Sequence, residues 1–171
     1  MELTALTALS PLDGRYRRTG ARLAPFFSEF GLIKYRVKVE IEWLKALAAE
    51  KGIKEVPAFS AKTLAELDAI VANFSLADAE AVKAHEKVTN HDVKAVEYFL
   101  KDKTAGNAQV TKVSEFIHFA CTSEDINNLS HALMLRDART EVILPALRQV
   151  ERKLTELAVG LAELPMLSRT H

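Results

Sequence analysis

The sequence predicts an all-α protein. Alanine and leucine, both strong helix formers, supply 25 and 22 of the 171 residues. Glycine and proline, which interrupt helices, number only 6 and 5. Apolar residues recur at spacings of three and four, which is the period of a helix, whereas the two-residue alternation of a strand is hard to find. A chain of this length buries roughly 70% of its unfolded surface, so it needs no disulfide or metal to hold a core.

The first predicted helix covers residues 26–50. Its apolar side chains repeat at helical spacing and form one stripe. The stripe consists of Phe26, Phe30, Ile33, Val37, Ile41, Leu44 and Leu47. Gly52 favours a helix end, and a linker over residues 53–59, containing Pro57, is expected to follow.

Hydroxyl and carboxylate side chains mark the starts of the next three helices. Ser60 has the character of a helix cap, and Ser75 with Asp78 has that of a reciprocal capping box. Asp92 is the predicted cap of the third helix. The three helices are expected over residues 60–73, 75–88 and 93–103.

A polar stretch over residues 103–111 contains Gly106 and is predicted to be a loop. This loop divides the chain into two predicted domains. Residues 1–110 are expected to form a small helical N-terminal domain. After a short helical piece at 114–119, residues 111–171 are expected to begin a bundle of long helices.

The first long helix of the second domain is predicted to start at Thr122. Thr122 and Ser123 offer hydroxyl caps, and two carboxylates follow them in the first turn, where the helix dipole favours negative charge. The helix is expected to reach residue 140, and Pro145 suits the first turn of the next helix. Apolar side chains over residues 142–164 cover more than one face, which suits a helix with neighbours on several sides.

Charge and composition exclude several classes of protein. Lys and Arg number 23 and so do Asp and Glu, and this zero balance argues against nucleic-acid binding, which needs a basic excess. No stretch approaches the ~20 apolar residues that cross a bilayer. The start of the chain lacks the features of a secretion signal, so a cytoplasmic protein is expected. The single cysteine, Cys121, lies in an apolar run and is predicted to be a packing residue.

Two polar clusters in the first domain are candidates for ligand binding. Arg15 and Tyr16 suit a phosphate, because guanidinium and phenol groups donate hydrogen bonds to its oxygens; a solvated basic N-terminus is the alternative. Asn90, His91 and Asp92 stand together at a predicted helix start, where simple capping is the alternative. The histidine spacing matches no metal-ligand pattern, so no metal site is expected.

Two further clusters lie in the second domain. Thr122 and Ser123 would place hydroxyls and free backbone N–H groups at the start of a long helix, which suits a carboxylate or phosphate; plain capping is the alternative. Thr170 and His171 follow a predicted helix end. On pattern alone, this histidine is a frayed surface residue.

Four motifs lie in order along the chain. They are Ser-Pro-Leu-Asp-Gly-Arg-Tyr at 10–16, Thr-Asn-His-Asp-Val-Lys-Ala-Val-Glu-Tyr-Phe at 89–99, Phe-Ile-His-Phe-Ala-Cys-Thr-Ser-Glu-Asp-Ile-Asn-Asn at 116–128, and Ser-Arg-Thr-His at 168–171. Together they closely resemble the bacterial adenylosuccinate lyases, a family within the fumarase and aspartase superfamily. The resemblance covers the whole chain, but the family's proteins are much longer, so the chain resembles their N-terminal portion.

The resemblance implies cleavage of adenylosuccinate to AMP and fumarate, and of the corresponding succinyl-carboxamide ribotide of purine synthesis, without cofactor or metal. The reaction is a β-elimination. His171 matches the general acid, and His91 matches a residue near the reacting centre. The other matches are Arg15 and Tyr16 for the nucleotide phosphate, Thr122 and Ser123 for a succinyl carboxylate, Asn90 and Asp92 for further substrate contacts, and Thr170 beside the acid.

The resemblance also implies a homotetramer, built on a bundle of long helices, whose active site combines three subunits. The family's base is a serine on a loop for which this sequence has no counterpart, so the isolated chain is expected to be an inactive N-terminal part. Two alternatives stay open. One is another lyase of the superfamily, of the argininosuccinate lyase or fumarase type, against which the motif at 89–99 argues. The other is a non-catalytic helical fragment.

Overall fold

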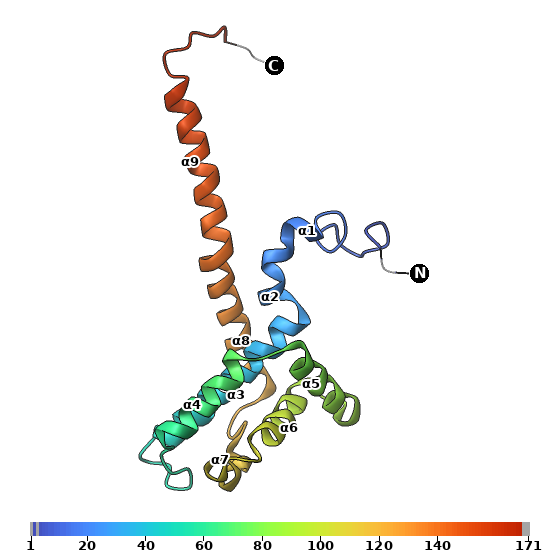
Figure 1. Ribbon diagram of the computed structural model, residues 1–171, viewed down its shortest axis with the longest axis vertical. Helices are drawn as coiled ribbons and strands as arrows, with labels where there is room; N and C mark the ends of the chain where they lie inside the picture. The colour runs from blue at the N-terminus through green and yellow to red at the C-terminus, as the bar shows by residue number, and fades with distance from the viewer. Residues whose placement is uncertain (1, 3, 169–171) are drawn as a thin grey trace.

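The fold is known from a computed structural model that describes residue 2 and residues 4–168 (Figure 1). Over this part of the chain the protein is helical and contains no strand, so the predicted all-α class is confirmed. The long helices are α3 (Glu29–Ala49), α4 (Ala61–Ala72), α5 (Leu76–Thr89), α6 (Asp92–Thr104), α8 (Ser123–Ala138) and α9 (Leu144–Gly160). The short ones are α1 (Arg17–Gly20), η1 (Ala21–Leu23), α2 (Ala24–Phe27), α7 (Ala108–Lys112), η2 (Ser114–Phe116) and the π-helical turn η3 (Arg139–Ile143).

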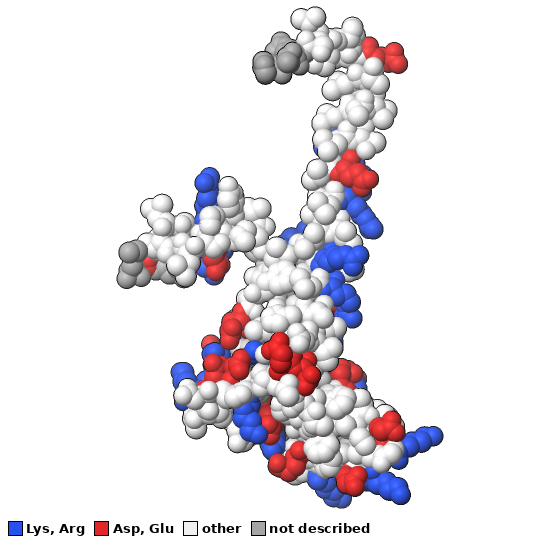
Figure 2. All heavy atoms as spheres, turned by 180° about the vertical axis from the view of Figure 1, so that it is seen from behind, with Lys and Arg blue, Asp and Glu red and all other residues white. Residues whose placement is uncertain are grey.

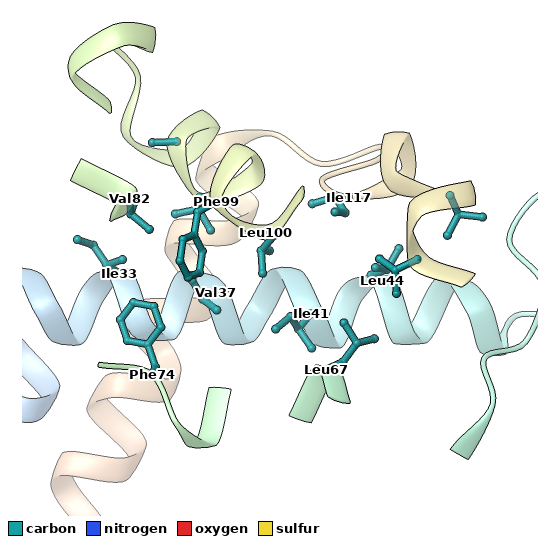
Figure 3. Close-up of a cluster of buried hydrophobic side chains, with 14 of the residues drawn as sticks. Ile33, Val37, Ile41, Leu44, Leu67, Phe74, Val82, Phe99, Leu100 and Ile117 are labelled. Atoms are coloured by element: carbon teal, nitrogen blue, oxygen red, sulfur yellow. The ribbon is translucent and has the colours of Figure 1, made fainter. Parts of the chain in front are cut away.

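Helix α3 is the centre of the fold. Helices α4, α5 and α6 contact it, and α8 packs along it as well. Phe99 and Leu100 of α6 lie on one side of α3, and Phe74 and Leu67 lie on another (Figure 3). The main core also includes Ile117, beyond the predicted domain boundary near residue 110. That boundary stays a prediction.

The predicted helix over residues 26–50 is interrupted at Ser28. This residue is extended, and its hydroxyl accepts a hydrogen bond from the Gly31 amide at 3.2 Å, so it caps α3 immediately after α2 ends. A Cβ on Gly31 would lie 2.6 Å from the Phe26 carbonyl oxygen. The chain therefore turns sharply where only glycine fits, and an apolar stripe does not reveal such a turn.

Three helix caps were predicted between residues 60 and 92, and two of them are confirmed and one is wrong. Ser60 and Ser75 cap α4 and α5, and Asp78 completes a capping box with Ser75. Helix α6, however, is capped by His91, whose Nδ1 accepts from the Lys94 amide at 3.2 Å. Asp92, the predicted cap, is instead the first residue of α6.

The predicted loop over residues 103–111 is in part helical. It contains the end of α6 and most of α7, which Asn107 caps by accepting from two backbone amides. Asn107 satisfies these amides locally, so a short helix forms in a stretch whose composition is typical of a loop. Of the short helical piece expected at 114–119, only the turn η2 is present.

Thr122 caps α8 as predicted, but α8 and α9 form one continuous rod rather than two separate helices (Figure 1). The π-helical turn η3 joins them. Pro145 lies in the first turn of α9, as expected. Because proline has no N–H to donate and crowds the preceding turn, a locally wider turn allows the helical path to continue. Helix α9 ends at Gly160, before the predicted end of the apolar stripe.

Helix α9 stands away from the body of the protein (Figure 1) and none of its residues is buried. Large apolar side chains at alternating spacings of three and four are exposed along it. They are Leu147 (60%), Val150 (57%), Leu154 (61%) and Leu157 (47%), and Leu161 (55%) follows just after the helix end. Figure 2 shows basic and acidic side chains interspersed over the helical body, in line with the zero net charge. None of the helices described is both long and apolar enough for a bilayer crossing.

Candidate active site

Two of the predicted site segments meet at the surface of the protein. His91 lies at the start of α6 and Ser123 at the start of α8, 32 residues later in the sequence. The Nε2 atom of His91 is 3.5 Å from the Ser123 hydroxyl oxygen. The side chain of His91 is 51% exposed, so a ligand can reach it from solvent. The structure therefore joins a titratable ring and a hydroxyl from two separate motifs.

The backbone between α5 and α6 aims the His91 ring. Asn90 adopts the left-handed conformation, with a φ of 54°, which asparagine tolerates better than most residues and which ends α5. Thr89 then fixes His91 through its hydroxyl, which accepts from the His91 amide and donates to the His91 carbonyl.

The cap hydrogen bond also selects the tautomer of His91. Because Nδ1 accepts from the Lys94 amide, it carries no proton in this arrangement. A neutral ring must therefore hold its proton on Nε2, the atom that faces Ser123. The site presents an N–H donor toward the start of α8.

Asp92 is held as a carboxylate by Arg36. Its Oδ2 lies 2.7 Å from Nη2 of Arg36, and its Oδ1 accepts from the Val93 amide at 2.9 Å. Partial burial opposes ionisation, but the charge of Arg36 and the amide hydrogen bond outweigh it and lower the pKa of Asp92 below its usual value. The predicted substrate contact of Asp92 stays a prediction, since these are its observed partners.

The start of α8 carries a complete capping box. The Thr122 hydroxyl accepts from the Asp125 amide, and the Asp125 carboxylate accepts from the amide and the hydroxyl of Thr122, at 2.7 and 2.9 Å. These two hydrogen bonds, the amide first, lower the pKa of Asp125. The Thr122 hydroxyl is thus engaged in capping, whereas the Ser123 hydroxyl faces His91. The first amides of a helix have no intrahelical acceptor, which makes this turn a suitable place for an anion.

Arg15 and Tyr16 lie apart from His91 and Ser123. Both are exposed, and the Arg15 guanidinium stacks on the Tyr16 ring at 4.9 Å from its centroid. The segment that carries them projects away from the helical body (Figure 1). Thr170 and His171, the predicted acid and its neighbour, lie outside the described residues.

Sequence reasoning missed Arg36 and Asn127. Arg36 is only 5% exposed, and its Nε donates to the Asn127 side-chain oxygen at 2.9 Å, so α3 is tied to both α6 and α8. Arg36 interrupts the apolar pattern of α3 and precedes Glu40 by one turn. That spacing is typical of a surface ion pair, so the pattern alone does not reveal that both side chains are buried.

Neither the cysteine nor a metal-binding cluster contributes to this site. Cys121 is half-buried in a cavity of about 650 Å³ between α3 and α8, whose lining residues do not include His91 or Ser123. Burial, with the nearby Glu40 and Asp125 carboxylates, raises the pKa of the Cys121 thiol. Within residues 2 and 4–168, His, Cys, Asp and Glu side chains form no group of three that could hold a metal ion.

Comparison of the sequence with known proteins identifies the family of this all-helical chain. Residues 14–171 match the protein family described as lyase, and the chain belongs to that family. It is similar to adenylosuccinate lyase of Escherichia coli (strain K12), with 61% identity, and to adenylosuccinate lyase of Haemophilus influenzae, with 60% identity. The adenylosuccinate lyase of Buchnera aphidicola subsp. Acyrthosiphon pisum is 46% identical. Each alignment covers all 171 residues of this chain but 38% of the relative, so the chain spans well under half the length of these relatives.

Proposed function

We propose that this chain is part of an adenylosuccinate lyase that releases fumarate from adenylosuccinate, leaving AMP, and likewise from the succinyl-carboxamide ribotide of purine biosynthesis, in the cytoplasm. The observation that carries the proposal is the 61% identity to the Escherichia coli adenylosuccinate lyase over every residue of the chain. No cofactor enters the proposed reaction.

The reaction is an elimination that needs a base, an acid and a holder for negative charge. A base removes the proton beside one carboxylate of the succinyl group, and the electron pair is delocalised into that carboxylate. The C–N bond then breaks and an acid protonates the departing nitrogen. Charge therefore builds up on a carboxylate during the first step. Donors placed around that carboxylate stabilise the transition state more than the substrate.

The start of α8 is the proposed holder of that carboxylate. Its first amides and the Ser123 hydroxyl are donors, and the helix dipole adds to their effect. His91 faces the same point with its Nε2, 3.5 Å from Ser123. Asn90, Asp92 and Thr122 are proposed to support the substrate around this pair.

The remaining assignments rest on the resemblance alone. His171 is proposed as the general acid, with Thr170 hydrogen-bonded beside it, and Arg15 with Tyr16 as the phosphate site. Because that pair lies apart from His91 within one chain, a site that uses both clusters takes one of them from a second copy. The unpartnered apolar stripe on α9 favours such an assembly, and a homotetramer is proposed.

A chimaera tests the proposed activity directly. Residues 1–171 replace the matching N-terminal 38% of the Escherichia coli relative, and turnover of adenylosuccinate is followed by ultraviolet absorbance. We expect AMP and fumarate from the chimaera, and no turnover from the 171-residue chain alone, since none of its residues is assigned as the base. Argininosuccinate and malate serve as competing substrates. Turnover of either one in preference to adenylosuccinate would assign the chain to another lyase, and an inactive, folded tetrameric chimaera would contradict the proposal.

A further inference from the structure

We propose that Arg36 is a positioning residue that sets the separation of His91 and Ser123. The inference rests on the proposed function only in taking this pair as part of the substrate site. Arg36 lies on α3, away from both motifs, and none of its contacts involves the ring of His91 or the hydroxyl of Ser123 directly. Its effect on the site is transmitted through one neighbour on α6 and one on α8.

The guanidinium of Arg36 forms a clamp between these two helices. Nη2 is 2.7 Å from Oδ2 of Asp92, the residue next to His91. Nε donates to Oδ1 of Asn127 at 2.9 Å, one helical turn beyond Ser123. A guanidinium is planar and rigid, so the two bonds fix the directions of both partners as well as their distances.

Among the described residues, Arg36 is the side chain that hydrogen-bonds to both α6 and α8, although Val39 of α3 also packs with Val93 of α6 and Ile126 of α8. Helix α6 and α8 share few contacts, whereas α3 packs against both. The contact between His91 and Ser123, at 3.5 Å, is too long to hold the two helix starts together by itself. Their separation therefore depends on α3, and Arg36 is the residue of α3 that bonds to both sides.

The ion pair is better explained by geometry than by stability. Arg36 is 5% exposed, and burying a charge costs free energy that its pairing only offsets. Asp92 also anchors the first turn of α6, where His91 receives its cap hydrogen bond from Lys94. Loss of Arg36 should thus displace the His91 ring and also weaken its preference for the tautomer protonated on Nε2.

The first test uses the 171-residue chain and needs no activity. Nuclear Overhauser contacts between the His91 ring protons and the Ser123 β protons report the separation, and the ring nitrogen shifts report the tautomer. We expect Arg36→Met to abolish the contacts and to mix the tautomers, and Arg36→Lys, which can keep one bond, to lie between Arg36→Met and the unsubstituted chain. The matched control is Arg136→Met, which breaks an arginine–aspartate contact between neighbouring residues of the same rod. Unchanged contacts and tautomer in Arg36→Met would overturn the inference.

The second test uses the chimaera. A misplacement of about 1 Å in a catalytic group costs about 10²-fold in rate, so we expect a loss of that order in kcat/KM for Arg36→Met and a partial recovery with lysine. A fall in thermal stability with unchanged kcat and KM would assign Arg36 a purely structural role and contradict the inference. If Arg36→Met does not fold, Asn127→Ala removes only the α8 side of the clamp and must itself weaken the Overhauser contacts. An inactive unsubstituted chimaera would count against the proposed function, while the spectra would still decide the role of Arg36.

Discussion

The Nδ1 atom of His118 lies 2.6 Å from Oε1 of Glu40, and the Glu40 carboxylate is fully buried. Its other oxygen, Oε2, has no hydrogen-bond partner in the described part of the chain. Burial raises the pKa of Glu40, although the bond to His118 opposes this shift. His118 has a φ of 65°, unusual for a side chain of this size, and the segment after it leads directly to Thr122. The contact between the half-buried His118 and the buried Glu40 therefore holds the backbone that enters the candidate site.

The raised pKa of Glu40 predicts a pH-dependent stability. The folded state binds the proton more tightly than the unfolded state, whose pKa is near 4.5. The resulting stabilisation is complete below that value and is lost as pH rises through the raised pKa. We expect Glu40→Gln to remove this loss. Relative to the unsubstituted chain, the free energy of unfolding of the variant should therefore increase from acid to neutral pH. Urea unfolding at a series of pH values measures the difference.

Glu97 provides a control of opposite sign. It is also buried, and burial opposes its ionisation, but Lys94 and Lys101 at 2.7 and 3.1 Å outweigh this and lower its pKa. Its contribution is present above the unfolded pKa and is lost as pH falls. Glu97→Gln should therefore be most destabilising at neutral pH and least so in acid. The same pH dependence in both variants would contradict the account given for Glu40.

Two capping boxes of the same design predict separate effects on stability and binding. Ser75→Ala and Thr122→Ala should each lower the free energy of unfolding by about 1 kcal/mol, because each leaves a first-turn amide without its acceptor. Ser123→Ala removes no cap, yet it should weaken inhibition of the chimaera by fumarate. Ser75 is the control, since its box lies at the start of α5. Weaker fumarate inhibition in Ser75→Ala would show that general destabilisation explains the effect.

His91 and His85 form a matched pair for the proposed chemistry. His85 lies on α5, with its Nε2 2.8 Å from Asp102 at the far end of α6, whereas His91 faces Ser123. In the chimaera we expect His91→Gln to lower kcat by about 10²- to 10⁴-fold, the usual contribution of a residue that transfers or directs a proton. His85→Gln should leave kcat unchanged. Equal kinetics for the two variants would remove His91 from the site.

Local chemistry explains which features could be predicted from the sequence. Ser60, Ser75 and Thr122 were identifiable as caps because a cap depends on residues within one turn of it. His91 was missed as a cap because its ring nitrogen accepts the hydrogen bond, a role that serine, threonine and aspartate fill more often. Such errors remain local and shift a helix start by one residue.

Packing explains what the sequence could not reveal. The spacing of Arg36 and Glu40 is equally typical of an exposed helix face. Both residues are buried only because α6, α8 and His118 pack against α3. The meeting of His91 with Ser123 has the same origin. The motifs identify His91 and Ser123 as candidate residues. The distance between these two side chains, however, depends on contacts between helices that are remote in the sequence.

The apolar stripe on α9 predicts self-association of this chain. Leu154 and Leu157 are 61% and 47% exposed, and they belong to a row with alternating spacings of three and four, the pattern of a helix that packs against another helix. A continuous apolar surface of this kind is unusual on a monomer.

We expect light scattering to give a mass above the 19.0 kDa of one chain, and Leu154→Lys with Leu157→Lys to restore that monomer value. The control, Gln149→Lys with Thr155→Lys, adds charged side chains at polar positions of the same helix and should stay associated. Since both pairs lie on an exposed helix, circular dichroism should find equal helix content in the two variants. A monomeric unsubstituted chain, or equal dissociation by both pairs, would mean that the stripe is not the contact surface.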